Sequence, residues 1–239
     1  ELAEKGTVND GIISTKLGLQ GISDLAEKII IERDLSLLED FNCRYHISQV
    51  SSAKSIEVIN KKKNEVNFTT GVSINNLSLN ENDIGDFRTF LKLSPPLRTE
   101  DDRIQLIKGI NKNLIDVIVS DHKPEDEESK RLTFAQAATG ACGIETLLPL
   151  SLELFHNGSV KLIKIIELLT SNPAKILKIN KGNLTIGNYA DFCIVDIYKP
   201  WIVKKEKLIS KSKNTSIENK KLQGKVLSTY INGEELFKI

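Results

Sequence analysis

The sequence predicts an α/β protein in which parallel strands alternate with helices. Alternating apolar stretches predict three strands, at residues 44–50, 66–73 and 115–120. Helical periodicity separates them, and strands that alternate with helices of this length are typical of a parallel sheet. The third strand ends abruptly in Asp121 and His122. A buried barrel strand delivers a metal ligand or a proton-transfer group to its C-terminal mouth in this way.

The first helix is expected over residues 22–40, with Ser23 as its N-cap. Its apolar face should comprise Ile22, Leu25, Ala26, Ile29 and Ile30. A second helix is predicted at 52–62, ending in three lysines, which suit the negative end of the helix dipole.

A rigid turn, Ser94-Pro-Pro-Leu-Arg98, precedes the third predicted helix. Thr99 and Asp102 resemble a capping box, with Asp in the place that Glu usually takes, so the helix should run from there to about residue 111.

The pattern changes after the third strand. Residues 123–131 are almost wholly charged and predict a solvated loop. Three helices should follow, at about 144–156, 159–169 and 172–178.

From residue 182 the signals are those of strands, so we expect a boundary that separates domain 1–181 from domain 182–239. Strands are predicted at 190–197 and 201–203, and a hairpin around Asn232-Gly233. Residues 204–221 are rich in Lys, Ser and Asn and predict an exposed excursion.

Composition excludes several classes of function. The net charge of +1 gives no electrostatic basis for binding nucleic acid or an anionic membrane, and the apolar runs fall far short of the roughly 18 residues of a membrane span. Cys43, Cys142 and Cys193 are widely spaced, which indicates a reducing compartment without a disulfide framework or zinc knuckle. The sequence contains no methionine, and we expect a fragment or a processed chain.

An ordered series of segments resembles the dihydroorotase family of the amidohydrolase superfamily. The segments that carry the resemblance are GIISTKLGLQG at 11–21, RDL at 33–35, YHISQVSS at 45–52, SPPLRTEDDR at 94–103, VSDHKPE at 119–125, GIETLLPL at 143–150, NPAKIL at 172–177, YADFCIVD at 189–196 and SKNT at 212–215. Each segment alone is weak, but their order and spacing match over essentially the whole chain.

The resemblance implies part of a (β/α)8 barrel of the TIM type, with a small β-sandwich at the C-terminal end. It also implies zinc-dependent interconversion of carbamoyl-aspartate and dihydroorotate in pyrimidine synthesis. A metal-held hydroxide is a nucleophile near neutral pH. The residue matched to Asp121 takes and returns the proton and also ligates the metal.

Several positions depart from the family pattern. Gln49 stands where the family has a ligand histidine, and an amide is a poor substitute for imidazole on zinc. Ser94 replaces a substrate-holding Asn, and Glu125 replaces a His. The backbone at Thr139 and Gly140 keeps its place and, by resemblance, offers N–H groups to the substrate ring.

Two histidine motifs of the family are missing from this chain. The family's Pro-His-His-Leu stretch is Ile74-Asn-Asn-Leu77 here, and its early His-x-His motif falls upstream of residue 1. His46 lies three residues before Gln49, which in a strand places the two side chains on opposite faces. We therefore expect a packed or hydrogen-bonded His46, and a supporting role for His122.

Three hypotheses remain open. The first is an active dihydroorotase. The second is a noncatalytic dihydroorotase-like protein that serves as a structural partner of aspartate transcarbamoylase. The third, a cyclic amidohydrolase acting on hydantoins or allantoin, is disfavoured by the Ser-Pro-Pro-Leu-Arg and Ser-Lys-Asn-Thr segments.

The resemblance implies a small-molecule substrate, a cytoplasmic location and an oligomer. Because the 239 residues carry about three recognisable barrel strands and lack the upstream ligands, we predict that this chain alone binds no catalytic zinc and is inactive.

Overall fold

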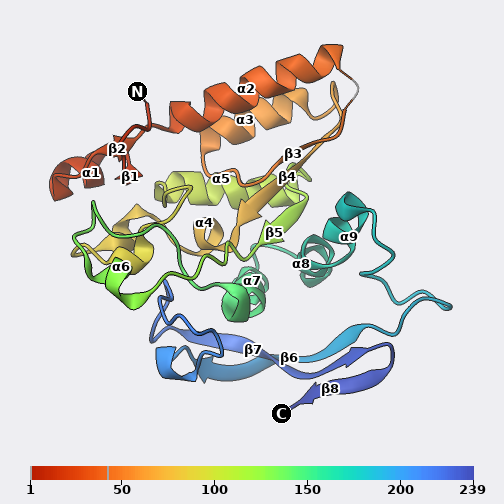
Figure 1. Ribbon diagram of the computed structural model, residues 1–239. Coiled ribbons are helices and arrows are strands. Elements are labelled where there is room, and N and C mark those ends of the chain that lie inside the picture. Colours follow the sequence, from red (N-terminus) through yellow and green to blue (C-terminus); the bar gives the residue numbers. More distant parts are fainter. Residues whose placement is uncertain (1, 42) are drawn as a thin grey trace.

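The computed structural model describes residues 2–41 and 43–239, which form three small sheets with helices packed around them (Figure 1). The N-terminal part contains β1 (Val8–Asn9), α1 (Ile12–Leu17), β2 (Gly21–Ile22) and α2 (Asp24–Asp40). The central part contains β3 (Tyr45–Ile47), α3 (Ala53–Lys62), β4 (Phe68–Ser73), α4 (Ile74–Ser78), α5 (Glu100–Asn111), β5 (Val117–Val119) and α6 (Glu127–Arg131). The C-terminal part contains α7 (Leu147–His156), α8 (Leu162–Leu169), α9 (Ser171–Leu177), β6 (Phe192–Ile202), β7 (Lys221–Ile231) and β8 (Glu234–Lys238).

The central sheet positions the candidate site. Its order is β3-β4-β5 and all its strands are parallel. Parallel strands need crossover connections, which here contain α3 and α5. Because the strands run in the same direction, their C-terminal ends lie at one edge of the sheet. This confirms the predicted α/β class and the three predicted strands.

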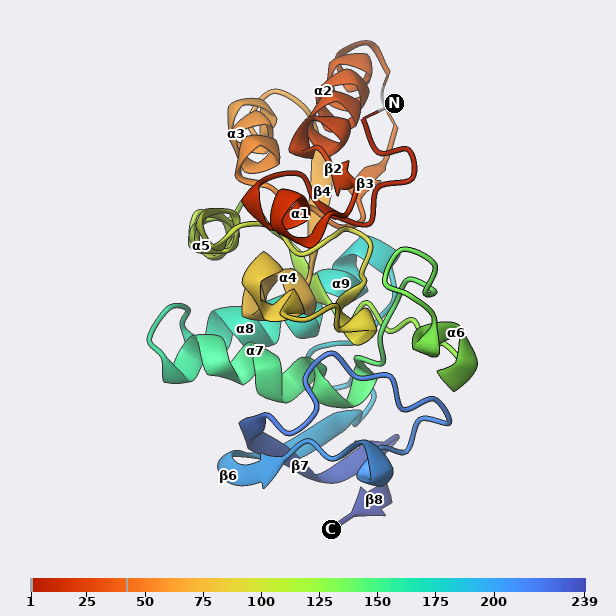
Figure 2. The same cartoon turned by 90° about the vertical axis from the view of Figure 1, so that its left-hand side faces the viewer.

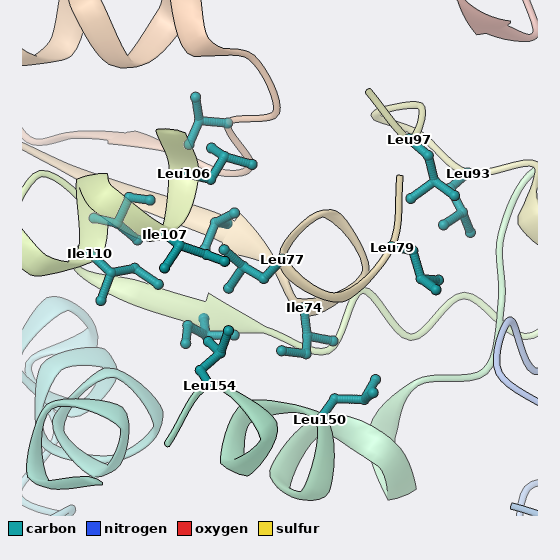
Figure 3. Close-up of a cluster of buried hydrophobic side chains, with 14 of the residues drawn as sticks. Ile74, Leu77, Leu79, Leu93, Leu97, Leu106, Ile107, Ile110, Leu150 and Leu154 are labelled. Carbon is teal, nitrogen blue, oxygen red and sulfur yellow. The ribbon is translucent and has the colours of Figure 1, made fainter. Parts of the chain in front are cut away.

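The apolar core lies between the central sheet and the helices on either side of it. Figure 3 shows side chains of α4, α5 and α7 meeting there, among them Leu77, Ile110 and Leu154. Each of these three is at most 2% exposed. Close packing of this kind fixes the directions of the strands whose ends carry the polar groups.

A second, antiparallel sheet lies beyond α7 (Figure 2). β7 pairs with β6 on one side and with β8 on the other, and α7 contacts β7. Gly224 has φ of +106°, and a Cβ there would collide with the Leu152 side chain of α7. Glycine therefore allows the helix to approach the sheet.

A buried arginine ties the N-terminal strands to the central part. Arg98 is 3% exposed and donates to the Asn9 side chain at 2.8 Å, the Ile22 carbonyl at 2.6 Å and the Ser51 hydroxyl at 3.2 Å. The Ser94–Arg98 turn predicted from sequence thus ends in a charged anchor.

The structure corrects several predictions. The predicted apolar face of α2 is largely exposed, with Ile29 at 48% and Ile30 at 45%, whereas Ile31 and Leu35 are buried. The apolar periodicity of the helix could not decide which of them is buried, because residues 29–31 are all isoleucine. The helix expected at 144–156 begins as a 3₁₀ turn (Ile144–Thr146), and Trp201 continues β6. The elements β1, α1, β2, α4 and α6 were not predicted. The segment 123–131, expected to be a solvated loop, contains α6, whose Lys130 is buried.

The prediction that residues 204–221 are exposed is wrong for residues 214–217. Asn214, Thr215, Ser216 and Ile217 are all buried. Polar composition suggested solvent, but the Asn214 side chain forms hydrogen bonds with Glu125 and Gly140, and the Ser216 side chain forms one with Asn75.

Candidate functional site

The C-terminal ends of the three parallel strands converge on Asp121. Gln49 follows β3 by two residues, Ser73 ends β4, and Asp121 follows β5 by two residues. Gln49 Nε2 donates to Asp121 Oδ1 at 3.0 Å, and Ser73 Oγ lies 3.4 Å from Asp121 Oδ2. Asp121 has φ of +49°, a left-handed conformation that a non-glycine residue adopts at some cost.

Burial and hydrogen bonds act on this carboxyl in opposite directions. Half-burial, the largest effect, raises the pKa of Asp121, while the hydrogen bonds from Gln49 and Ser73, the nearby Asn75 amide and the charge of Lys123 lower it. The net direction is upward. A carboxyl whose pKa is raised exchanges a proton at less cost near neutral pH, as a general acid or base requires.

Asn75 is a site residue that the sequence prediction missed. Its side chain is 3% exposed, and its Oδ1 accepts from Ser216 Oγ at 3.1 Å. Its Nδ2 is near enough to Asp121 to lower the pKa of that carboxyl, but it forms no hydrogen bond with any group of the described residues. The available signal was the pair of asparagines immediately after a predicted strand.

The side chains around Asp121 include few of the groups that bind zinc in proteins. Asp121 provides one carboxylate, and its neighbours are an amide, a hydroxyl and a second amide. Within residues 2–41 and 43–239 no group of three or more His, Cys, Asp or Glu could hold a metal. Since zinc sites in proteins have three or four such ligands, the described residues by themselves do not fit a catalytic zinc.

The histidines lie elsewhere. His46 Nδ1 is 2.7 Å from Thr69 Oγ1 of the neighbouring strand, and burial lowers the pKa of His46. The expectation of a hydrogen-bonded His46 is therefore confirmed. His122 Nδ1 accepts from the Gly143 N–H at 3.1 Å, at the start of the 3₁₀ turn that precedes α7.

Thr139 and Gly140 lie next to the segment that follows Asp121. A Cβ on Gly140 would be 2.7 Å from the Lys123 carbonyl oxygen, and Lys123 N donates to Ala141 O at 2.8 Å. The Gly140 N–H donates to the Lys92 carbonyl, at 2.9 Å. The predicted donor at Gly140 is thus already engaged within the chain.

Asn214 links two of the predicted substrate residues. It donates from Nδ2 to the Gly140 carbonyl at 3.1 Å and accepts through Oδ1 from the Glu125 N–H at 3.3 Å. Ser94, in contrast, is exposed, and no hydrogen bond joins it to the other predicted site residues in the part of the chain that the structure describes.

The sequence is similar to those of known amidohydrolases. The profile of the amidohydrolase family matches residues 5–236. A dihydroorotase of Ehrlichia chaffeensis is 41% identical over 239 residues, 99% of this chain and 54% of that protein. A dihydroorotase of Anaplasma phagocytophilum is 37% identical over 99% of this chain and 54% of its own length. The chain therefore spans about half the length of the curated relatives it matches.

Solved structures agree in fold. An L-hydantoinase of Arthrobacter aurescens has a TM-score of 0.83 at 27% identity, over 89% of this chain and 49% of that chain. A dihydropyrimidinase of Brevibacillus agri has a TM-score of 0.84 at 20% identity, over 90% of this chain and 49% of that chain. The profile match and the level of identity place the chain in the amidohydrolase family, as a member of the dihydroorotase family within it.

Proposed function

We propose that this chain contributes to a dihydroorotase-type cyclic amidohydrolase, which interconverts carbamoyl-aspartate and dihydroorotate. The observation that carries the proposal is the convergence of three strand ends on the half-buried Asp121. The similarity to proteins named dihydroorotase supplies the substrate class, a small cyclic amide.

In this proposal Asp121 moves the proton. Breaking the ring amide requires a proton on the leaving nitrogen, and ring closure requires its removal. Gln49 and Ser73 orient the carboxyl through their hydrogen bonds. The family's metal-ligating role for Asp121 and for position 49 also stays a proposal, and we derive no step through zinc because the described residues do not by themselves fit it.

The fold assignment at finer detail is also a proposal. We propose that residues 1–181 form part of a TIM-type barrel and that 182–239 form part of a β-sandwich. The parallel order β3-β4-β5 supports the first assignment, and the antiparallel sheet β6-β7-β8 supports the second.

The substrate-binding assignments to Ser94, Glu125, Thr139 and Gly140 remain proposals of unequal support. The bridge that Asn214 makes between Glu125 and Gly140 supports a common role for these two positions. The assignment of Ser94 is supported only by its position before Pro95 and Pro96, where the family has a substrate-holding Asn.

A second candidate function is a noncatalytic partner of aspartate transcarbamoylase. Gln49 in the place of a ligand histidine favours it, as does the single carboxylate at the strand ends. An oligomer would suit either function.

The test is an Asp121→Asn substitution in the complete natural protein, with dihydroorotate hydrolysis as the readout. If the proposal is correct, kcat falls by about 10²-fold or more, because the amide cannot carry the proton. The control is Asp86→Asn, an exposed carboxylate outside the site. Wild-type protein without hydrolysis would overturn the enzymatic proposal and favour the noncatalytic partner.

A further inference from the structure

Two lysine side chains are almost fully buried near the Thr139–Gly140 segment. Lys92 is 8% exposed and Lys130 is 2% exposed. Neither forms an ion pair with a carboxylate among the described residues. Buried lysines without a charged partner are rare, because removing an ammonium from water costs several kcal/mol.

The two ammonium groups bind backbone carbonyls instead. Lys92 Nζ donates to Ala135 O and to Ala137 O, each at 2.8 Å. Lys130 Nζ donates to Ala138 O at 2.7 Å and to Thr89 O at 3.0 Å. Hydrogen bonds from a charged donor are stronger than neutral ones, so the two lysines fix the carbonyls of residues 135, 137 and 138.

Backbone hydrogen bonds complete the arrangement. The Ala138 N–H donates to Ser129 O at 3.0 Å and the Gly140 N–H to Lys92 O at 2.9 Å. Between these two engaged donors, the Thr139 N–H has no acceptor among residues 2–41 and 43–239. Thr139 is half-buried and next to Gly140, which packs against Lys123, two residues after Asp121.

Burying the two lysines has an energetic cost that an apolar side chain would not have. Burial lowers the pKa of both lysines, that of Lys130 to about 8, which reports the cost of keeping charge there. A hydrophobic residue of similar size would avoid this cost but would leave the Ala135, Ala137 and Ala138 carbonyls unpaired, whereas the Thr89 carbonyl also accepts from the Lys92 N–H at 3.0 Å. The two lysines therefore lower the stability of the fold but fix the backbone conformation of residues 135–138 through their hydrogen bonds.

We propose that Lys92 and Lys130 are positioning residues that hold residues 135–140 in place and so present the Thr139 N–H to an oxygen of the substrate. This inference rests on the proposed function. The ligand group is a carbonyl or carboxylate oxygen of a cyclic amide or of its ring-opened product, because an N–H donor binds an acceptor.

The test combines kinetics with hydrogen exchange in the complete natural protein. Lys92→Met and Lys130→Met remove the ammonium at nearly constant volume. Lys130→Gln, which keeps amide donors without charge, is the milder variant should Lys130→Met not fold. Lys108→Met, an exposed lysine on α5, is the matched control.

We expect at least tenfold faster exchange at residues 135–140 in both Met variants. KM for dihydroorotate should rise about tenfold or more, with kcat reduced less, and dihydroorotate should slow exchange at Thr139 in wild type but not in the Met variants. The Lys108→Met control should match wild type in every measurement.

Two results would overturn the inference. One is unchanged exchange at 135–140 in both Met variants. The other is faster exchange with wild-type KM and wild-type protection of Thr139 by dihydroorotate. If wild type lacks turnover, the proposed function is refuted, and the exchange of the Thr139 N–H in the presence of dihydroorotate then tests the positioning role. Protection of Thr139 in wild type but not in the Met variants would support that role. No protection of Thr139 in wild type would refute it.

Discussion

At the scale of single residues, the chain stabilises buried charge with neutral dipoles as well as with opposite charges. Asp121 receives hydrogen bonds from an amide and a hydroxyl, and Lys130 donates to carbonyl oxygens. Burial outweighs these contacts and displaces both pKa values towards the neutral form, upward for the acid and downward for the base.

The displaced pKa of Lys130 predicts how stability depends on pH. Its folded-state pKa of about 8 lies below its ordinary value of 10.5, so between these values the unfolded state binds more protons than the folded state. Stability contributed by this group therefore rises with pH across that window, by up to about 3 kcal/mol. The free energy of unfolding in urea, measured at pH 7 and pH 10.5 for wild type and Lys130→Met, checks this. The free energy of unfolding of wild type, relative to that of Lys130→Met, should increase from pH 7 to pH 10.5. The same difference at both pH values would contradict the prediction.

At the scale of elements, the N-terminus of α3 shows how neighbouring helices are joined. The Glu27 carboxylate of α2 accepts from the Ser51 N–H at 3.0 Å and the Ser52 N–H at 3.1 Å. Asp102 of α5 accepts from the Ala53 N–H at 2.7 Å. Carboxylates at a helix N-terminus satisfy otherwise unpaired donors and complement the helix dipole. Helices α2, α3 and α5 are thus connected by polar contacts as well as by apolar packing.

Replacing Glu27 by Ala should lower the stability of the chain by about 2 kcal/mol, because two backbone donors of the α3 terminus lose their acceptor. For a chain of this size that corresponds to a fall in Tm of roughly 4–8 °C. Thermal unfolding followed by circular dichroism measures it. The control is Glu57→Ala, an exposed position on α3 that should change Tm little, and equal shifts for both variants would contradict the argument.

At the scale of the whole molecule, the candidate site lies where the strands of the central sheet end. The central sheet has three strands and the site has a single carboxylate. Within the described residues, no helix is both long and apolar enough to cross a membrane. The sequence similarity extends over nearly the whole chain and about half of each relative.

The isolated 239-residue chain should therefore bind no zinc at catalytic stoichiometry and should not hydrolyse dihydroorotate, since one carboxylate and one amide do not make a zinc site. Elemental analysis of the purified chain after dialysis against zinc, together with a hydrolysis assay, tests this. One bound zinc per chain accompanied by turnover would show the prediction to be wrong.

Sequence patterns predicted what depends on neighbours along the chain. The alternation of apolar residues at 115–120 predicted β5, and the polar end of that stretch pointed to Asp121. The match to a ligand position of the family pointed to Gln49, whose Nε2 lies 3.0 Å from Asp121 Oδ1. Contacts between distant segments escaped prediction. Lys92 and Lys130 resemble ordinary surface lysines until the fold brings carbonyls around them, and Asn75 is fixed by Ser216, 141 residues away.

The connection between β6 and β7 has a practical consequence for where foreign sequence can be inserted. Its 3₁₀ turn at Lys205–Lys207 is exposed, whereas Asn214 lies beneath the surface and holds Gly140 and Glu125. A peptide tag placed within the turn would extend into solvent, since exposed loop tips tolerate insertion. The same tag placed ten residues later would separate the β6–β7 hairpin from the groups that surround the strand ends, although both positions look equally polar in the sequence.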